Sequence, residues 1–147
     1  MRNSIIQEHI EKLINTHCTA YRPDVLPRDL KRGKAGDCFD HCLIQAMRNP
    51  KYQYVEGVAK VIHPKKKLDW ILHAWLTDGV HAYDPTWLAE AEDQEHPMPA
   101  YYVGIAMPIR SVMEFVSATG YKSVLANYYR NPELAEQCFR LNYGVKV

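Results

Sequence analysis

The sequence predicts one domain of the α+β class, in which helices flank a small antiparallel sheet. Segments with apolar residues three or four positions apart occur at both ends of the chain, and strand-like segments rich in Val, Ile, Tyr and Trp occupy its middle. Of the 147 residues, 47% are hydrophobic and 24% are charged, and no stretch reads as a linker or repeat. This size and balance fit a single domain over 1–147 with a buried core.

The first third of the chain should contain two helices separated by an irregular segment. Apolar residues at helical spacing predict a helix over 4–18. Residues 21–36 hold two prolines, two glycines and many charges, which favours irregular structure. Asp37 is a good N-cap, so a second helix should begin there and end near Arg48, before Asn49-Pro50.

The middle of the chain should form the sheet, and the last third should return to helix. Strand-like segments lie at 52–62, 68–77, 80–87 and 101–107. A helix through Val112, Phe115 and Val116 is expected after Pro108. A last helix should start at 131–133, because Asn-Pro-Glu supplies a cap, a first-turn proline and an early acid.

One predicted hairpin brings together an imidazole and a carboxylate. Asp78-Gly79 between two strand-like runs indicates a two-residue turn. With that loop, facing residues have numbers that add to 157, so His73 and Asp84 lie directly opposite each other, within reach of a hydrogen bond. Such a pair is what a general base needs, because the carboxylate orients the histidine and stabilises the imidazolium. The alternative is a half-buried histidine beside a carboxylate at a strand end.

Cys38 follows Gly36-Asp37 at the predicted start of the second helix. The unpaired N–H groups and the positive end of the helix dipole favour a thiolate there, and they can also bind a developing oxyanion. Most free cysteines are small buried hydrophobic residues, and this remains the alternative for Cys38.

Three motifs in this order resemble the transglutaminase-like superfamily of cysteine enzymes with a papain-like core. They are Gly36-Asp37-Cys38-Phe39, then His73-Ala74-Trp75, then Tyr83-Asp84-Pro85-Thr86-Trp87. The resemblance covers residues 36 to about 108. It implies a papain-like fold in which the nucleophile helix packs on an antiparallel sheet of about four strands, with additional N- and C-terminal helices.

The resemblance also implies a catalytic triad of Cys38, His73 and Asp84. Cys38 would attack an amide carbonyl and form a thioester, which would pass to water in a peptidase, amidase or deamidase, or to an amine in a transamidase. The Cys38 backbone N–H is the expected oxyanion donor, with Tyr21 or Gln7 as candidates for a second. The expected substrate-binding residues are Trp75, Tyr21 and Trp87.

Other interpretations stay open at this point. Cys38, His41 and Cys42 could hold a metal ion with His73, although the spacing is not typical of zinc sites and a metal would occupy the nucleophile. We expect Cys42 to pack beneath Cys38 and Glu56 to have a structural role. A protein with this triad could also be a catalytically silent binding module or adaptor.

Composition limits the partners that we expect. The net charge of +1 gives no sign of a nucleic-acid-binding protein, and the basic run 65–67 reads as a solvated hairpin loop, with a ligand or nucleic-acid patch as the alternative. No apolar run predicts a membrane span or a signal peptide. We therefore expect a cytoplasmic protein, suited to a bacterium or phage, without cofactor or metal. Its substrate would be a small amide or an exposed protein segment, and its oligomeric state is left open.

Overall fold

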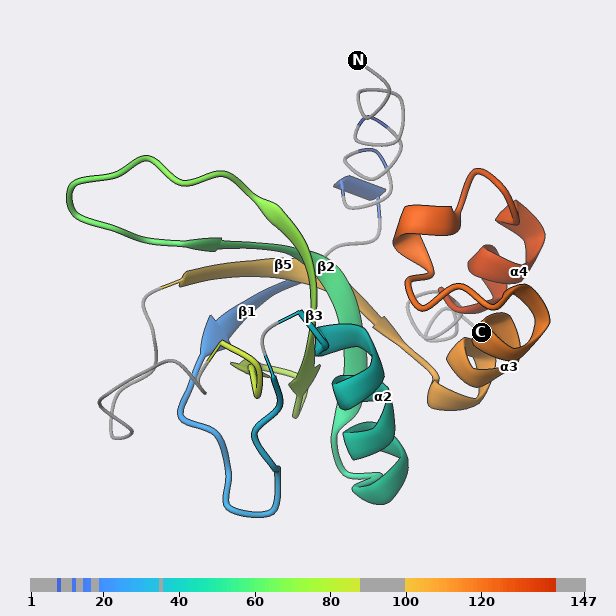
Figure 1. The fold of residues 1–147 in the computed structure, drawn as a ribbon, viewed down its shortest axis with the longest axis horizontal. Coiled ribbons are helices and arrows are strands. Elements are labelled where there is room, and N and C mark those ends of the chain that lie inside the picture. The colour runs from blue at the N-terminus through green and yellow to red at the C-terminus, as the bar shows by residue number, and fades with distance from the viewer. Residues whose placement is uncertain are drawn as a thin grey trace.

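The computed structural model describes residues 19–34, 36–87 and 100–139, together with Glu8, Lys12, Asn15 and Thr16. The strands are β1 (Thr19–Pro23), β2 (Gln53–Val61), β3 (Ile71–Thr77), β4 (His81–Tyr83) and β5 (Ala100–Met107). The α-helices are α2 (Cys38–Arg48), α3 (Ile109–Thr119) and α4 (Pro132–Gln137), and a short 3₁₀ helix, η2, covers Leu125–Asn127. Figure 1 shows the helices on one side of the sheet and the β2–β3 hairpin extending away from them.

The five strands close into a barrel in the order β1-β4-β3-β2-β5. Strand β1 closes it, because it pairs in parallel with β4 and antiparallel with β5. The fold class predicted from the sequence, a papain-like or transglutaminase-like core on an open antiparallel sheet of about four strands, is therefore wrong. The missing strand lies at 19–23, which the sequence placed partly in an irregular segment because Pro23 and flanking charges mask a short strand.

The strands divide the buried residues into two clusters. The first lies inside the barrel, since every strand contributes to it, and it consists of Tyr21, Val55, Ala59, Trp75, Ala82, Ala100, Tyr102 and Ala106. Gly104 makes room there, because a Cβ at this position would lie 2.8 Å from the Trp75 ring. The second cluster lies between the outer face of the strands and the helices, and α2 contributes Cys38, Cys42 and Ala46 to it.

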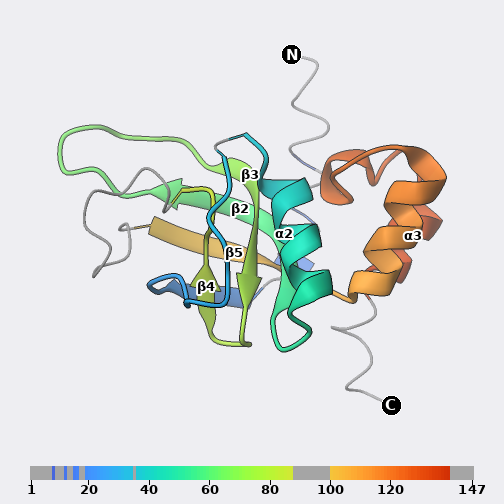
Figure 2. The same ribbon diagram turned by 60° about the horizontal axis from the view of Figure 1, so that its bottom comes forward.

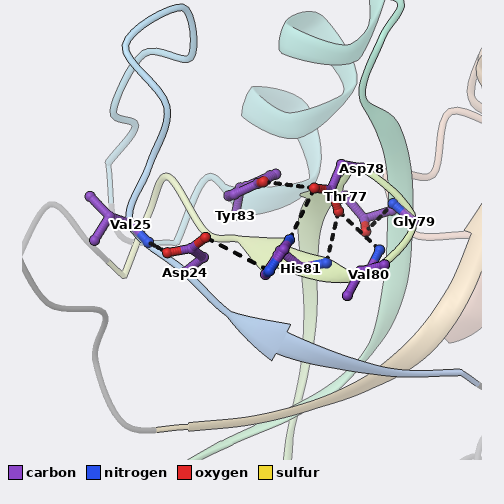
Figure 3. Close-up of polar contacts among 8 residues, drawn as sticks. All are labelled: Asp24, Val25, Thr77, Asp78, Gly79, Val80, His81 and Tyr83. Atoms are coloured by element: carbon purple, nitrogen blue, oxygen red, sulfur yellow. Dashed lines mark hydrogen bonds and ion pairs between the residues drawn. The ribbon is translucent and has the colours of Figure 1, made fainter.

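The hairpin between β3 and β4 has a longer loop than predicted. Thr77 pairs with Ala82 and Leu76 with Tyr83, so the two-residue turn and the register built on it are wrong. The Asp78 side chain explains the difference (Figure 3), because its Oδ1 accepts hydrogen bonds from the backbone N–H groups of Val80 and His81. These bonds stabilise a four-residue loop.

Asp78 also links the hairpin to its surroundings. Its Oδ2 accepts hydrogen bonds from the Tyr83 hydroxyl and from His81 Nδ1, and the other nitrogen of His81 lies 3.9 Å from Asp24, just after β1 (Figure 3). Burial raises the pKa of Asp78, but the hydrogen bonds from His81 and Val80 outweigh it and hold that pKa well below its usual value. This cluster lies where the parallel β1–β4 pair closes the barrel.

Most of the other elements expected from the sequence occur in the described residues. The helix 37–48, the strand 101–107 and the helix after Pro108 are confirmed. The last helix begins at Pro132 but ends at Gln137, earlier than the apolar pattern suggested. The opening helix expected over 4–18 lies largely outside the described residues, although Glu8, Lys12, Asn15 and Thr16 are helical.

Glu56 fastens the C-terminal helical segment to the barrel. Its buried carboxylate accepts hydrogen bonds from the Tyr54 hydroxyl, the Ser123 hydroxyl and the backbone N–H groups of Val124 and Leu125. Burial raises the pKa of Glu56, and these hydrogen bonds offset part of that effect. The expected structural role of Glu56 is therefore confirmed.

Candidate active site

His73 and Asp84 form a buried hydrogen-bonded pair. His73 Nε2 lies 2.7 Å from Asp84 Oδ2, and the two residues are 4% and 2% exposed. A carboxylate only accepts hydrogen bonds, so Nε2 carries the proton, and Nδ1 is the ring nitrogen left for another partner. The predicted contact is confirmed, even though the predicted pairing is not.

The contact survives the register error because the error is a shift by two residues. The observed pairs add to 159 instead of 157, so Asp84 lies diagonally from His73 and not directly opposite it. Side chains on a strand alternate between faces, and a shift by two keeps both residues on the same face. A diagonal pair on one face is still within reach of an imidazole and a carboxylate.

Several further donors hold the Asp84 carboxylate in place. Its Oδ1 accepts hydrogen bonds from the backbone N–H and hydroxyl of Thr86 and from the backbone N–H of Trp87, at 3.2–3.3 Å. The Tyr102 hydroxyl donates to Oδ2 at 2.7 Å, so it shares this oxygen with His73. Burial and the Asp84 charge raise the pKa of Tyr102, which keeps its hydroxyl protonated. The carboxylate can neither rotate freely nor attract water to the oxygen that holds His73.

The environment favours a protonated His73. Burial lowers the pKa of its imidazole, but hydrogen bonds with Asp84 and with Cys38, together with their negative charges, outweigh burial and raise it from 6.5 to about 9. Because its side chain raises this pKa, Cys38, the third predicted residue, lies next to the pair. Since Nε2 is engaged by Asp84, Nδ1 is the ring nitrogen available to the thiol.

Cys38 reaches the histidine because it is the first residue of α2. Gly36, with φ of 90°, turns the chain before Asp37, and α2 then packs its Cys38, Cys42 and Ala46 side against the sheet. Cys42 is fully buried one turn further on, where burial raises its pKa well above the ordinary value of a thiol. The expected packing role of Cys42 is confirmed. Cys38, Cys42 and Cys138 are free thiols.

The three residues lie in a nearly closed site. Cys38 is only 7% exposed, and the half-buried Trp87 ring stacks on His73 with centroids 4.2 Å apart and an angle of 25° between the planes. Loop 24–34 packs beside them, since Gly33 N–H donates to the Pro85 carbonyl and His41 Nε2–H to the Lys31 carbonyl. Little water can compete for the hydrogen bonds of this site.

The three expected binding residues differ in how close they lie to His73 and in how deeply they are buried. Trp87 covers His73, as described. Trp75 is fully buried inside the barrel against Tyr21 and Tyr102, with ring centroids 6.0 Å and 5.0 Å away, and Tyr21 is 7% exposed. Direct contact of Trp75 or Tyr21 with a substrate stays a prediction. Gln7, the other candidate oxyanion donor, lies outside the described residues.

Tyr102 is the residue that sequence reasoning missed. Its position shows a signal in retrospect, because alternation along 101–107 puts Tyr102 on the face opposite to that of Tyr101. However, no pattern in the sequence predicts that Tyr102 of β5 and Asp84 of the β3–β4 hairpin meet inside the barrel.

Among residues 19–34, 36–87 and 100–139, no three His, Cys, Asp or Glu side chains gather in a way that could hold a metal ion. In the same part of the chain, no helix is long and apolar enough to cross a lipid bilayer. Comparison with family models, with curated proteins and with solved structures gives no significant match.

Proposed function

We propose that this protein is a cysteine-dependent enzyme that transfers the acyl group of an amide through a thioester on Cys38. The observation that carries the proposal is the buried chain of contacts from Asp84 through His73 to the Cys38 thiol, with 2.7 Å between the His73 and Asp84 atoms. A nucleophile, a base and a group that orients the base, connected by hydrogen bonds, are the minimum for such chemistry. The order of the three motifs, as in transglutaminase-like enzymes, supports the same reaction class.

The first half of the reaction would proceed as follows. As an imidazolium, His73 already holds the proton that the thiol gives up, and the Cys38 sulfur forms a bond to the amide carbon, whose oxygen gains the negative charge. The backbone N–H of Cys38, at the amino end of α2, is the proposed donor to that oxygen. His73 then gives its proton to the departing nitrogen as the C–N bond breaks. A thioester and a free amine result.

The second half would release the acyl group. His73 takes a proton from water or from an acceptor amine, the oxygen or nitrogen attacks the thioester carbon, and the C–S bond breaks with return of the proton to sulfur. Throughout, Asp84 holds Nε2–H and stabilises the imidazolium. Hydrolysis by a peptidase, amidase or deamidase uses water, whereas transamidation uses an amine. The nearly closed site implies that substrate enters after loop 24–34 moves.

Thiol labelling and turnover together test the proposal. Cys38→Ala should lose both rapid labelling by iodoacetamide and turnover of amide substrates. His73→Gln should label more slowly than the wild type, because no base then accepts the thiol proton. Cys138→Ala is the matched control, since it removes another buried thiol and should change neither rate. Full turnover by Cys38→Ala would eliminate the proposal, and a catalytically silent binding module would then be the better interpretation.

A further inference from the structure

The outer face of the sheet continues past the helices and becomes exposed. Across β3, β2 and β5, a first row of outward residues (Ala74, Glu56, Ile105) is fully buried, and the next row (Leu72, Val58, Val103) is half-buried. In the third row, Lys60 pairs with Tyr101 on β5, and Trp70 lies next to it, just before β3. Trp70 is 46% exposed and Tyr101 57%. The same face therefore passes from core to open apolar surface.

This exposed end adjoins the candidate site. Cys38 belongs to the buried cluster on the same outer face, and its side chain is near enough to His73 to raise the pKa of the imidazole. Trp70 precedes Leu72 by two residues and therefore points to the same side as Leu72, whereas His73 points with Trp75 toward the barrel interior. Leu72 packs against the cluster that contains Cys38, so the exposed end of this face continues from the surroundings of the thiol. We refer to Leu72, Val58, Val103, Trp70, Lys60 and Tyr101 as the hairpin strip.

Positive charge concentrates beside the hairpin strip although the whole chain has a net charge of only +1. Lys65, Lys66 and Lys67 are exposed in the loop between β2 and β3, which projects away from the helices (Figures 1 and 2). None of these three lysines forms an ion pair with another residue in the described ranges. Asp69 is the acidic residue of this loop, so an excess of positive charge remains.

The geometry of the aromatic rings favours a peptide over a nucleic acid. The Trp70 and Tyr101 rings are 6.2 Å apart and tilted by 35°, and Lys60 Nζ lies 5.8 Å from the centre of the Trp70 ring. Base stacking needs an open ring face, and the ammonium group covers one here. Exposed Ile62 adds aliphatic surface that suits side chains better than bases.

We infer that the hairpin strip and Lys65–Lys67 bind an acidic, extended protein segment with an apolar side chain, and that they select such segments as substrates for Cys38. The lysines complement carboxylates, and the Trp70–Tyr101 surface receives the apolar group. The claim that these segments are substrates rests on the proposed function. The binding surface itself stands on the exposed rings and the exposed lysines.

A binding experiment tests the surface without requiring catalysis. The probe is a fluorescein-labelled peptide rich in Asp and Glu with a single Phe and a single Gln, and its control replaces the acids by Asn and Gln. Binding of the acidic peptide should weaken about tenfold when Lys65, Lys66 and Lys67 are together replaced by Gln, and similarly in Trp70→Ala. A triple variant at Arg48, Lys51 and Arg110, which removes the same charge elsewhere, should bind like the wild type.

Two outcomes would refute the proposed peptide-binding surface. One is equal binding of the acidic peptide by all variants. The other is that oligothymidylate or phosphatidylserine vesicles bind more tightly than the acidic peptide and that the same substitutions abolish this binding. The selecting role has a separate readout. In the lysine triple variant, kcat/KM for an amide in the acidic peptide should fall about tenfold, while that for a small amide stays unchanged. An equal loss for both substrates would refute selection. Absence of all turnover in the wild type would refute the proposed function and leave the binding result intact.

Discussion

Replacing Asp84 by Asn should remove the proton that His73 holds at neutral pH. The pKa of His73 is about 9, and burial alone would lower it from the ordinary 6.5. Without the carboxylate, burial opposes only the effect of Cys38, so we expect the pKa to fall toward 6.5, a change worth up to about 3 kcal/mol. At pH 8 the protonated fraction should then fall from about 90% toward a lower limit of about 3%. In addition, the new amide N–H faces Nε2 and favours the tautomer with its proton on Nδ1, which cannot accept the thiol proton.

The assay is an NMR titration of the ¹⁵N-labelled imidazole of His73, which reports both the pKa and the tautomer. Asp29→Asn is the matched control, since it removes a carboxylate that pairs with Lys51 on the surface and should leave His73 unchanged. If His73 still titrates near 9 in Asp84→Asn, then Asp84 is not what stabilises the imidazolium, and the reasoning about the pair is refuted.

Three further predictions follow from the same contacts. Tyr102→Phe removes a donor that shares Oδ2 of Asp84 with His73, so this oxygen is left to the imidazolium alone. The titration should show a higher pKa for His73, and an unchanged or lower value would contradict this. Glu56→Gln should lower the free energy of unfolding, measured in urea, by about 2–5 kcal/mol, because buried donors lose their acceptor. The exposed control Glu114→Gln should have little effect. Equal urea midpoints for Glu56→Gln and the wild type would contradict the role of Glu56 in holding the C-terminal segment. Finally, folding raises the pKa of His73, so its contribution to stability is full below about pH 6.5 and is lost as pH rises through about 9. Urea denaturation at several pH values should show a loss of up to about 3 kcal/mol in the wild type across this range. An equally steep loss in His73→Gln would refute the assignment to His73.

The contact between His73 and Asp84 could be predicted from sequence because it depends on alternation and not on the exact loop. Any hairpin whose register differs by an even number of residues puts the two side chains on the same face. The loop itself could not be predicted, because its length is set by Asp78, whose side chain competes with the ladder for the N–H groups of Val80 and His81. An Asp-Gly pair favours a short turn but does not exclude this arrangement.

The barrel could not be predicted for a different reason. Its closure depends on β1, which has only five residues and pairs with β4 and β5, distant in sequence. Local propensity carries little information about such non-local pairs. Tyr102 was missed as a consequence, since its approach to Asp84 follows from the way β5 wraps around the barrel. By contrast, the start of α2 at Cys38 could be predicted from local signals alone, namely Gly36 and Asp37 before an apolar stripe.

Intact-protein mass spectrometry after brief mixing with an activated acyl donor, such as p-nitrophenyl acetate, tests the central claim most directly. The wild type should gain one acyl group, mapped by proteolysis to Cys38 and removed by hydroxylamine as a thioester is. His73→Gln should acylate much more slowly, and Cys38→Ser should carry no acyl group on Cys42 or Cys138. Acylation elsewhere, or an equal rate in His73→Gln, would contradict a thiol activated by this histidine.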